Sequence, residues 1–300
     1  MRSRLADALM SGVAVIDKPA GWTSHQVVAR VRRLTGTRKV GHAGTLDPMA
    51  TGVLIIGVEK ATRLLGYLSL ADKAYEATIR LGMATVTDDA EGEVLSIAGA
   101  ADVSEADLEA GIANLRGEIL QRPSSVSAIK ISGERSYARV RAGQDVELPA
   151  RPVRVSRFCL LASRVNEVAG VPVLDVHVQV ECSTGTYVRA IARDLGAALG
   201  VGGHLTSLRR ARIGTFSIEE AQTLDEAKKG LVLLSLDRVV PRFFATLTVD
   251  DTQASYVRNG RRLIGVSLPE TTTALLSEAG HFLALYRREG PDAVAKAVFG

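Results

Sequence analysis

The sequence predicts an α+β fold with a large mixed, mainly antiparallel sheet flanked by helices, followed by a small β-rich module. Segments 73–81 and 174–182 alternate between apolar and polar residues with the period of two that is typical of half-buried strands. Helical periodicity over residues 24–34 and 104–115 supplies the α component. With 300 residues and 46% apolar content, the chain is long enough to bury a sizeable core and a smaller second domain.

Each predicted strand has one continuous apolar face. In 73–81 this face consists of Tyr75, Ala77, Ile79 and Leu81, opposite Glu76, Thr78 and Arg80. In 174–182 it consists of Leu174, Val176, Val178, Val180 and Cys182. A shorter apolar run, 53–58, indicates a fully buried strand.

The predicted helices are marked by capping residues. We expect Ser24 to be the N-cap of the first helix and Gly36 to end it, and Ser104 to be the N-cap of the second. A third helix should follow segment 183–189, which places Arg189 and Arg193 one turn apart. Residues 202–210 come next and are rich in glycine and basic residues.

Two domains are predicted, over residues 1–240 and 241–300. The second is expected from the strand patterns 244–249 and 281–287 and the Asn259-Gly260 turn. Within the first, residues 122–150 combine Pro, Gly and Ser with basic side chains, which is typical of a mobile loop able to close on a ligand.

Composition excludes several classes of protein. Asp7 and Asp17 interrupt the apolar run that a signal peptide needs, and no stretch is long enough for a membrane span. Cys159 and Cys182 are isolated, which fits a reduced cytoplasmic compartment and favours neither a disulfide framework nor a zinc site. The five histidines are scattered, so no metal is expected.

Charge is distributed in blocks. Residues 1–70 carry ten Lys/Arg against four Asp/Glu, residues 71–121 three against eleven, and residues 122–164 nine against three. Two basic blocks around an acidic one suggest one side that faces a polyanion and one that faces solvent. In the first block, Arg30, Arg32 and Arg33 lie beside the apolar stripe of the first helix and are followed by Arg38 and Lys39.

The most informative stretch is Gly41-His-Ala-Gly-Thr-Leu-Asp-Pro48. Pro48 keeps Asp47 out of the helical region, and the two glycines allow close backbone approach. An aspartate on such a loop can be a nucleophile, an acid/base group or simply a turn former. The sequence does not contain other common catalytic motifs. The glycines at 36 and 41 have the spacing of a phosphate-binding loop, but the Lys and Ser/Thr that must follow are absent. A dinucleotide-binding fingerprint, a nucleophile elbow and a His-Glu-x-x-His motif are also absent. Any catalysis would therefore use a bare carboxylate without metal or organic cofactor.

Four motifs together resemble bacterial tRNA pseudouridine-55 synthases of the TruB type. They are Asp17-Lys-Pro-Ala-Gly-Trp-Thr-Ser24, the Gly41–Pro48 stretch, Lys73-Ala-Tyr75 and Gly185-Thr-Tyr-Val-Arg189, in the family's order and with similar separations. The resemblance covers about residues 12–240. It implies a pseudouridine synthase fold that isomerises uridine-55 in the T loop of tRNA without a cofactor. It also implies that residues 122–150 clamp RNA and that the terminal module is PUA-like and RNA-binding.

The same resemblance assigns roles to individual residues. Asp47 falls on the catalytic aspartate, Tyr75 on the base-stacking tyrosine, and Arg189 on the arginine that pairs with the carboxylate. His42 falls on a histidine that packs against displaced T-loop bases. Tyr187 and Leu208 match positions that line the uracil pocket, and Lys18 matches a motif that supports the catalytic loop.

General chemistry agrees with these roles. An aspartate in a buried pocket tends to become protonated, and a facing arginine keeps it charged through a bidentate fork. A base inside a folded loop must leave its stack to be modified, so the enzyme needs a pocket surrounded by basic surface. We expect Arg30, Arg33, Lys39, Lys130, Arg139 and Arg141 to contact the phosphates of the tRNA T-arm stem-loop. A monomer would suit one bulky RNA.

Two other classes of protein remain open at this point. A non-catalytic tRNA-binding or RNA-folding protein would show the same basic blocks and the same stacking tyrosine. A carboxylate-nucleophile hydrolase acting on a nucleoside or sugar would be expected to bring a second catalytic carboxylate. Loss of conversion with retained tRNA binding in Asp47→Asn would distinguish an enzyme from the binding protein.

Overall fold

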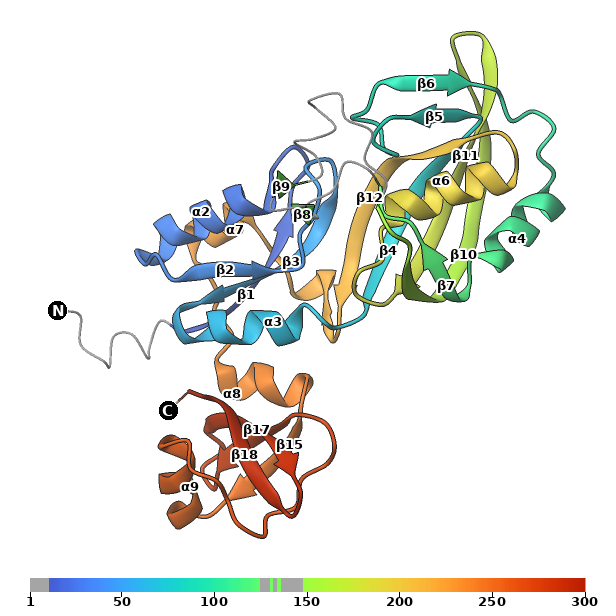
Figure 1. Cartoon of the computed structure of the whole chain (residues 1–300). Helices are drawn as coiled ribbons and strands as arrows, with labels where there is room; N and C mark the ends of the chain where they lie inside the picture. The colour runs from blue at the N-terminus through green and yellow to red at the C-terminus, as the bar shows by residue number, and fades with distance from the viewer. Residues whose placement is uncertain (1–10, 125–129, 132–133, 136–147, 300) are drawn as a thin grey trace. The chain divides into compact units, whose positions relative to one another are not determined.

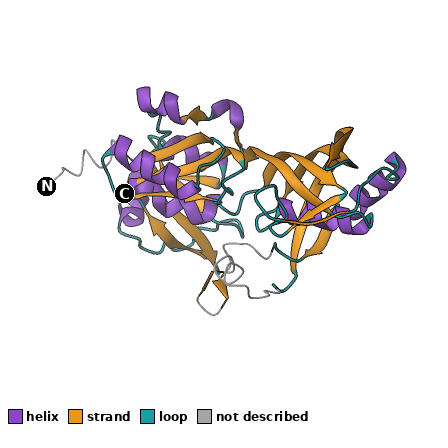
Figure 2. Cartoon of the chain, turned by 90° about the horizontal axis from the view of Figure 1, so that it is seen from above, coloured by secondary structure: helices purple, strands orange, loops and turns teal. Residues whose placement is uncertain are grey.

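The computed structural model describes residues 11–124, 130–131, 134–135 and 148–299, with only the backbone described for 130–131 and 134–135. Two compact units emerge (Figures 1 and 2). Within the described ranges, the first comprises 11–46, 53–69 and 214–299, and the second comprises 47–52, 70–124, 130–131, 134–135 and 148–213. Among the described residues, no helix is both long and apolar enough to cross a bilayer. The predicted boundary between residues 240 and 241 stays a prediction.

The second unit contains an antiparallel sheet in the order β12–β4–β11–β10–β7. Its strands are β4 (Lys73–Leu81), β7 (Gly117–Gln121), β10 (Arg151–Val168), β11 (Val171–Cys182) and β12 (Gly203–Ile213). Helix α6 (Val188–Ala198) packs on β12 and β4, and helix α4 (Glu105–Asn114) packs on β10. A small hairpin of β5 (Met83–Thr85) and β6 (Val94–Ile97) adjoins β12, and β8 (Lys130–Ile131) pairs with β9 (Glu134–Arg135).

The predicted alternation is confirmed in both strands. Strand β4 has the predicted bounds, and all five apolar residues listed for 174–182 are buried. The polar face of β4 is less exposed to solvent than predicted, since Thr78 is also buried. Its hydroxyl accepts a hydrogen bond from Ser207 Oγ at 2.8 Å, which compensates for the loss of water.

In the first unit, β1 (Gly12–Lys18) pairs in parallel with β14 (Gln222–Thr223), and β2 (Val40–Ala43) pairs antiparallel with β3 (Thr51–Val58). Helix α2 (Ser24–Thr35) buries Val27, Val28 and Val31 in a shared core with Leu54 and Ile56 of β3. The remaining described helical segments of this unit before the terminal sheet are η1 (Glu59–Leu64), α3 (Leu65–Leu68), η2 (Ile218–Glu220), α7 (Leu224–Lys229), α8 (Leu236–Val239) and η3 (Val240–Arg242).

The C-terminal part of this unit forms its own sheet in the order β15–β16–β17–β18. The strands are β15 (Ala245–Val249), β16 (Thr273–Ser277), β17 (Phe282–Glu289) and β18 (Asp292–Val298), covered by helix α9 (Asp251–Arg258). The predicted β-rich character is confirmed, whereas helix α9 was not predicted. Parallel pairs in the first unit and the antiparallel sheet of the second agree with the predicted mixed, mainly antiparallel architecture.

One predicted cap is wrong. Thr23, not Ser24, is the N-cap of α2, and its side chain forms a capping box with Gln26. Ser24 is instead a buried helical residue whose hydroxyl bonds to the backbone of Leu46. The predicted C-terminal cap is confirmed, because Gly36 has a φ of 65° and its N–H bonds to the carbonyl of Arg32.

Candidate active site

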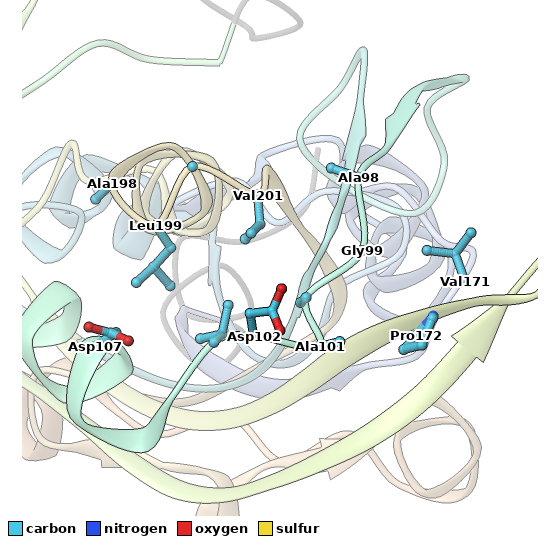
Figure 3. A pocket seen from close by; sticks show the side chains of 13 residues that line it. Ala98, Gly99, Ala101, Asp102, Asp107, Val171, Pro172, Ala198, Leu199 and Val201 are labelled. Atoms are coloured by element: carbon cyan, nitrogen blue, oxygen red, sulfur yellow. The ribbon is translucent and has the colours of Figure 1, made fainter.

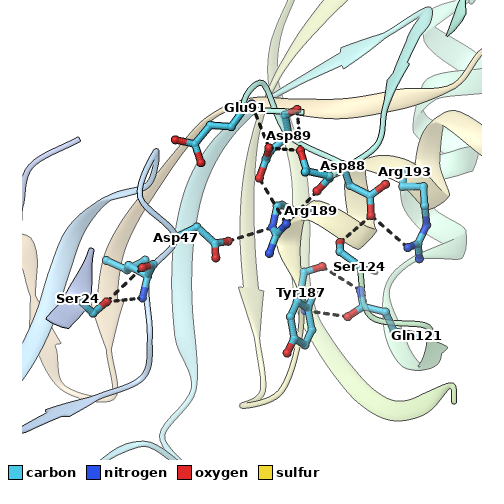
Figure 4. A network of polar contacts seen from close by, with 12 residues as sticks. Ser24, Asp47, Asp88, Asp89, Glu91, Gln121, Ser124, Tyr187, Arg189 and Arg193 are labelled. Carbon is cyan, nitrogen blue, oxygen red and sulfur yellow. Dashed lines mark hydrogen bonds and ion pairs between the residues drawn. The ribbon is translucent and has the colours of Figure 1, made fainter. Parts of the chain in front are cut away.

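Asp47 and Arg189 form an ion pair in the second unit (Figure 4). Arg189 Nε lies 2.9 Å from Asp47 Oδ2. The Arg189 side chain is 6% exposed, while that of Asp47 is 36% exposed. A buried guanidinium therefore holds and orients a carboxylate that a ligand can still reach.

Asp47 occupies a tight turn between β2 and β3. Its carbonyl accepts a hydrogen bond from the N–H of Ala50 at 3.1 Å, and Pro48 fixes the backbone that follows. The preceding residue, Leu46, is held by Ser24, whose Oγ accepts from the Leu46 N–H at 2.9 Å and donates to its carbonyl at 3.1 Å. Gly44 has a φ of 76°, a conformation that glycine adopts without strain.

Arg189 is the second residue of helix α6, and the start of this helix is fixed by a neighbouring strand. The Gln121 side chain, at the end of β7, accepts from the N–H of Tyr187 at 2.8 Å and donates to its carbonyl at 3.1 Å. Tyr187 is the N-cap residue, and its own side chain makes no capping hydrogen bond. Gln121 thus satisfies the Tyr187 N–H, one of the backbone donors that have no partner within the helix.

A second carboxylate also holds Arg189. Its Nη1 lies 3.4 Å from Asp89 Oδ2 and donates to the carbonyl of Thr87 at 2.9 Å. The Asp89 side chain is only 4% exposed, so this pair is nearly dry. The sequence analysis does not identify Asp89 as a site residue, because the acidic block 71–121 predicts a solvent-facing surface. The feature that could indicate Asp89 is the Thr87-Asp88-Asp89 run, which lies close after a predicted strand.

Tyr75 lies in the middle of the sheet. Within the β4–β12 pairing it is opposite Arg210, and Leu208 is opposite Ala77, so Tyr75 and Leu208 are near neighbours although 133 positions apart in the sequence. Tyr75 and Leu208 are each 7% exposed. Burial raises the pKa of the Tyr75 hydroxyl, against the charge and hydrogen bond of Arg210. The charge of Asp47 raises that pKa further, so the tyrosine is neutral and within electrostatic reach of the carboxylate.

Lys73 and Cys182, which are opposite each other in the β4–β11 pairing, extend this buried region. Burial, helped by the charge of Arg210, lowers the pKa of Lys73 to about 8. Burial raises the pKa of Cys182 to about 11. Lys73 Nζ donates to the carbonyl of Ala71 at 2.7 Å.

The other predicted site residues of known placement lie in the first unit. Lys18 is fully buried, and its Nζ donates to the carbonyls of Pro19 at 2.9 Å and Trp22 at 2.6 Å. His42 packs edge-on against His25, with ring centroids 5.4 Å apart.

The predicted RNA-contacting residues differ in exposure, and their contact with RNA stays a prediction. Arg30 is half-buried and Arg33 is exposed, both on α2. Lys39 is 75% exposed and lies 3.5 Å from Glu59. Lys130 lies in β8, where only the backbone is described, and Arg139 and Arg141 fall outside the described residues.

A pocket of about 480 Å³ lies elsewhere in the second unit (Figure 3). Its lining includes Ala98, Asp102, Pro172 and Leu199, and none of Asp47, Tyr75, Arg189 or Leu208. It is therefore separate from the carboxylate–arginine site.

Comparison with known families identifies the class of this protein as pseudouridine synthase. Residues 32–188 match the family model for the N-terminal domain of TruB family pseudouridylate synthases, and residues 189–239 match the tRNA pseudouridylate synthase B C-terminal domain. The chain belongs to the TruB family.

Curated relatives agree along nearly the whole length. The chain is 56% identical over 285 residues to the tRNA pseudouridine synthase B of Nocardia farcinica, covering 95% of this chain and 92% of the relative. It is 52% identical over 290 residues to the tRNA pseudouridine synthase B of Streptomyces griseus, covering 96% and 97%.

Solved structures show the same fold. A Cbf5-Nop10-Gar1 complex contains a chain that is 26% identical with a TM-score of 0.71, covering 100% of this chain and 88% of that one. An H/ACA RNP bound to a substrate RNA containing 2'-deoxyuridine contains a chain that is 25% identical with a TM-score of 0.69, with the same coverage.

Proposed function

We propose that this chain converts uridine-55 in the T loop of tRNA to pseudouridine, using Asp47 without a cofactor. The observation that carries the proposal is the Asp47–Arg189 pair, in which a buried arginine holds a partly exposed carboxylate at 2.9 Å. The relatives named tRNA pseudouridine synthase B support tRNA as the substrate.

The reaction breaks the bond between N1 and the ribose C1′ and forms one between C5 and C1′, with loss of the C5 proton and gain of a proton at N1. An ionised carboxylate at this point serves either as a nucleophile or as a negative charge beside an electron-poor carbon. Arg189 orients the Asp47 carboxylate through the ion pair at 2.9 Å, which both roles need. Desolvation around Arg189 strengthens the pairing, since water competes poorly at a side chain that is 6% exposed.

Tyr75 and Leu208 are proposed to contact the everted uracil. Their adjacency in the β4–β12 pairing offers an aromatic ring and an apolar side chain on one stretch of sheet, which suits a flat, weakly polar base. Stacking on an aromatic side chain contributes about 1–3 kcal/mol per base. Tyr187 is proposed to line the same pocket, with its backbone fixed by Gln121.

Contacts to the T-arm are proposed from the basic segments. Arg33 and Lys39 are exposed and are candidates for phosphate contact together with Arg30. Lys130, Arg139 and Arg141 remain proposals on sequence grounds, as do the stacking role of His42 and the supporting role of Lys18. We propose that one monomer binds one tRNA.

The test uses an unmodified tRNA transcript carrying uridine at position 55, followed by site-specific mapping of pseudouridine. The wild-type chain should produce pseudouridine at that position alone. Asp47→Asn should abolish conversion while changing tRNA affinity less than about twofold, because the substitution removes charge but almost no volume. A wild-type chain that binds tRNA without conversion would favour the non-catalytic RNA-binding protein instead.

A further inference from the structure

A second polar cluster lies beside the Arg189 site and is not used by the proposed chemistry. Asp88 Oδ2 accepts a hydrogen bond from Ser124 Oγ at 2.6 Å and forms an ion pair with Arg193 Nη1 at 3.2 Å (Figure 4). The Arg193 Nη2 also donates to the carbonyl of Arg122 at 2.7 Å. One carboxylate and one guanidinium therefore connect three segments of the second unit.

The same three segments contain Arg189 itself and the residues that contact it or fix the start of its helix. Asp88 precedes Asp89, which pairs with Arg189, and follows Thr87, whose carbonyl accepts from Arg189. Arg193 is one helical turn after Arg189 in α6. Ser124 follows the end of β7, where Gln121 holds the backbone of Tyr187.

The conformation of Asp88 makes the cluster specific. Asp88 has a φ of 60°, which is uncommon for a residue other than glycine and needs support from its surroundings. Its N–H donates to the carbonyl of Thr85 at 3.3 Å and its carbonyl accepts from Leu205 at 3.0 Å, so the turn is also fixed to β12. This turn directs Thr87 O and the Asp89 carboxylate at the same guanidinium.

Charge in the cluster is balanced by its neighbours. Burial raises the pKa of Asp88, against the Ser124 hydrogen bond and the positive charges of Arg193 and Arg189, while Asp194 raises it further. Removing Arg193 would leave a buried carboxylate with less compensation, and the turn would relax to expose or protonate it.

We propose that Asp88, Arg193 and Ser124 are positioning residues that fix Arg189 against Asp47 by holding the Thr87–Asp89 turn, the start of α6 and the end of β7 together. The proposal rests on the proposed function. None of the three residues pairs with Asp47 directly, so each acts through Arg189 and its partners. Loosening the cluster should slow the chemical step and leave the affinity for tRNA unchanged.

The experiment measures single-turnover conversion of an unmodified tRNA transcript at saturating enzyme, with the tRNA dissociation constant measured separately. Arg193→Gln should lower the single-turnover rate about 10–100-fold and Ser124→Ala about 3–10-fold, with dissociation constants within about twofold of wild type. Arg193→Lys should be faster than Arg193→Gln but slower than wild type. A lysine keeps the positive charge beside Asp88 but lacks the second guanidinium nitrogen that donates to the Arg122 carbonyl.

Arg80→Gln provides a matched control. Arg80 forms a bidentate pair with Asp175 at 2.7 Å, joins β4 to β11 in the same unit and is similarly half-buried. This variant should lose comparable thermal stability but keep the wild-type rate within about twofold. Combining Asp89→Asn with Arg193→Gln should cost less than the product of the two single effects, since both act on the same guanidinium.

Several outcomes would overturn the proposal. Wild-type rates in folded Arg193→Gln and Ser124→Ala, an equal loss in Arg80→Gln, or a weakened dissociation constant with an unchanged rate would each do so. Ser124→Ala removes only the hydroxyl oxygen that bonds to Asp88, so this variant is expected to fold. It can therefore test the proposal even if Arg193→Gln does not fold. Absence of conversion by the wild-type chain would instead overturn the proposed function and this inference with it.

Discussion

Ser24 and Leu46 are joined by two hydrogen bonds across 22 positions of sequence, at 2.9 Å and 3.1 Å. The Ser24 side chain uses one oxygen both to accept from the amide of Leu46 and to donate to its carbonyl. Because Leu46 immediately precedes Asp47, a buried helical serine fixes the backbone from which the carboxylate extends.

Ser24→Ala should therefore loosen the Asp47 loop. It leaves two buried backbone groups of Leu46 without this partner, which costs about 1–3 kcal/mol of unfolding free energy. We expect the single-turnover rate to fall about tenfold, since small displacements of a reacting group are costly. Denaturant unfolding and the tRNA conversion assay measure the two effects.

Thr23→Ala is the control for this variant. Thr23 Oγ1 accepts from the N–H of Gln26 at 3.2 Å as the N-cap of α2, but Thr23 is not the residue that bonds to Leu46. Its loss should cost about 1 kcal/mol of stability and leave the rate unchanged. Equal rate losses in both variants would show that helix stability, rather than the Leu46 bonds, controls the loop.

Asp89→Asn should weaken the hold on Arg189 by the second of its two carboxylate partners. The variant keeps the shape of the side chain but removes a negative charge that is 4% exposed and 3.4 Å from the guanidinium. We expect a rate lower by about 10–100-fold with tRNA affinity retained, because a group that positions catalytic charge acts mainly on the chemical step. Conversion assays beside filter binding would measure this, and a purely affinity-based loss would contradict it.

Gly52→Ala should prevent folding or destabilise the chain severely. Gly52 has a φ of 102°, and a Cβ there would overlap the backbone carbonyl of Arg210, with which it is paired across β3 and β12. Gly117→Ala is the control, since Gly117 also has a positive φ, 85°, but open space around its Cβ position. That control should cost only the backbone strain of about 1–2 kcal/mol. Thermal unfolding of both variants distinguishes strain from overlap.

We expect the free energy of unfolding to rise with pH because Lys73 has a lowered pKa in the folded chain. Its pKa is about 8 in the folded chain against 10.5 for an ordinary lysine. Between pH 8 and pH 10.5 the unfolded chain binds more protons at this residue than the folded chain does. The contribution of Lys73 to the free energy of unfolding is therefore complete above about pH 10.5 and is lost as the pH falls through 8. The full contribution is on the order of 3 kcal/mol.

The measurement is the difference in unfolding free energy between wild type and Lys73→Met at pH 7 and pH 9. That difference should shift in favour of wild type as pH rises. Cys182 has the opposite sign, because its pKa is about 11 instead of 9 and stability is lost as pH rises between those values. Because the charge of Lys73 lowers the pKa of Cys182, both chains should also carry Cys182→Ala, which removes the Cys182 effect from the difference. A difference independent of pH would show that Lys73 is not desolvated.

Local patterns were sufficient for much of the fold. Strand β4 and most of β11 follow from alternation, and α2 from its apolar stripe and Gly36, because these elements bury one face. Strand β12 was not predicted within the glycine-rich segment 202–210. It contains the buried polar residues His204 and Arg210, which remove the alternation that marks a strand.

The site was only partly predictable. Motifs in the sequence indicated Asp47 and Arg189, which the structure pairs, while the stacking role of Tyr75 stays a prediction. Motifs did not indicate Asp88 and Asp89, since an acidic block normally faces solvent and only the tertiary structure supplies the two arginines that allow burial. Long-range ion pairs of this kind leave no periodic signal in the chain.

The sharing of one guanidinium by two carboxylates has a consequence for how an RNA enters. Asp47, Asp89 and Arg189 together carry one surplus negative charge, so this centre offers no attraction to phosphate despite its arginine. By itself this trio favours an uncharged nucleobase over the sugar–phosphate chain. Attraction of the polyanion then has to come from basic side chains outside the trio.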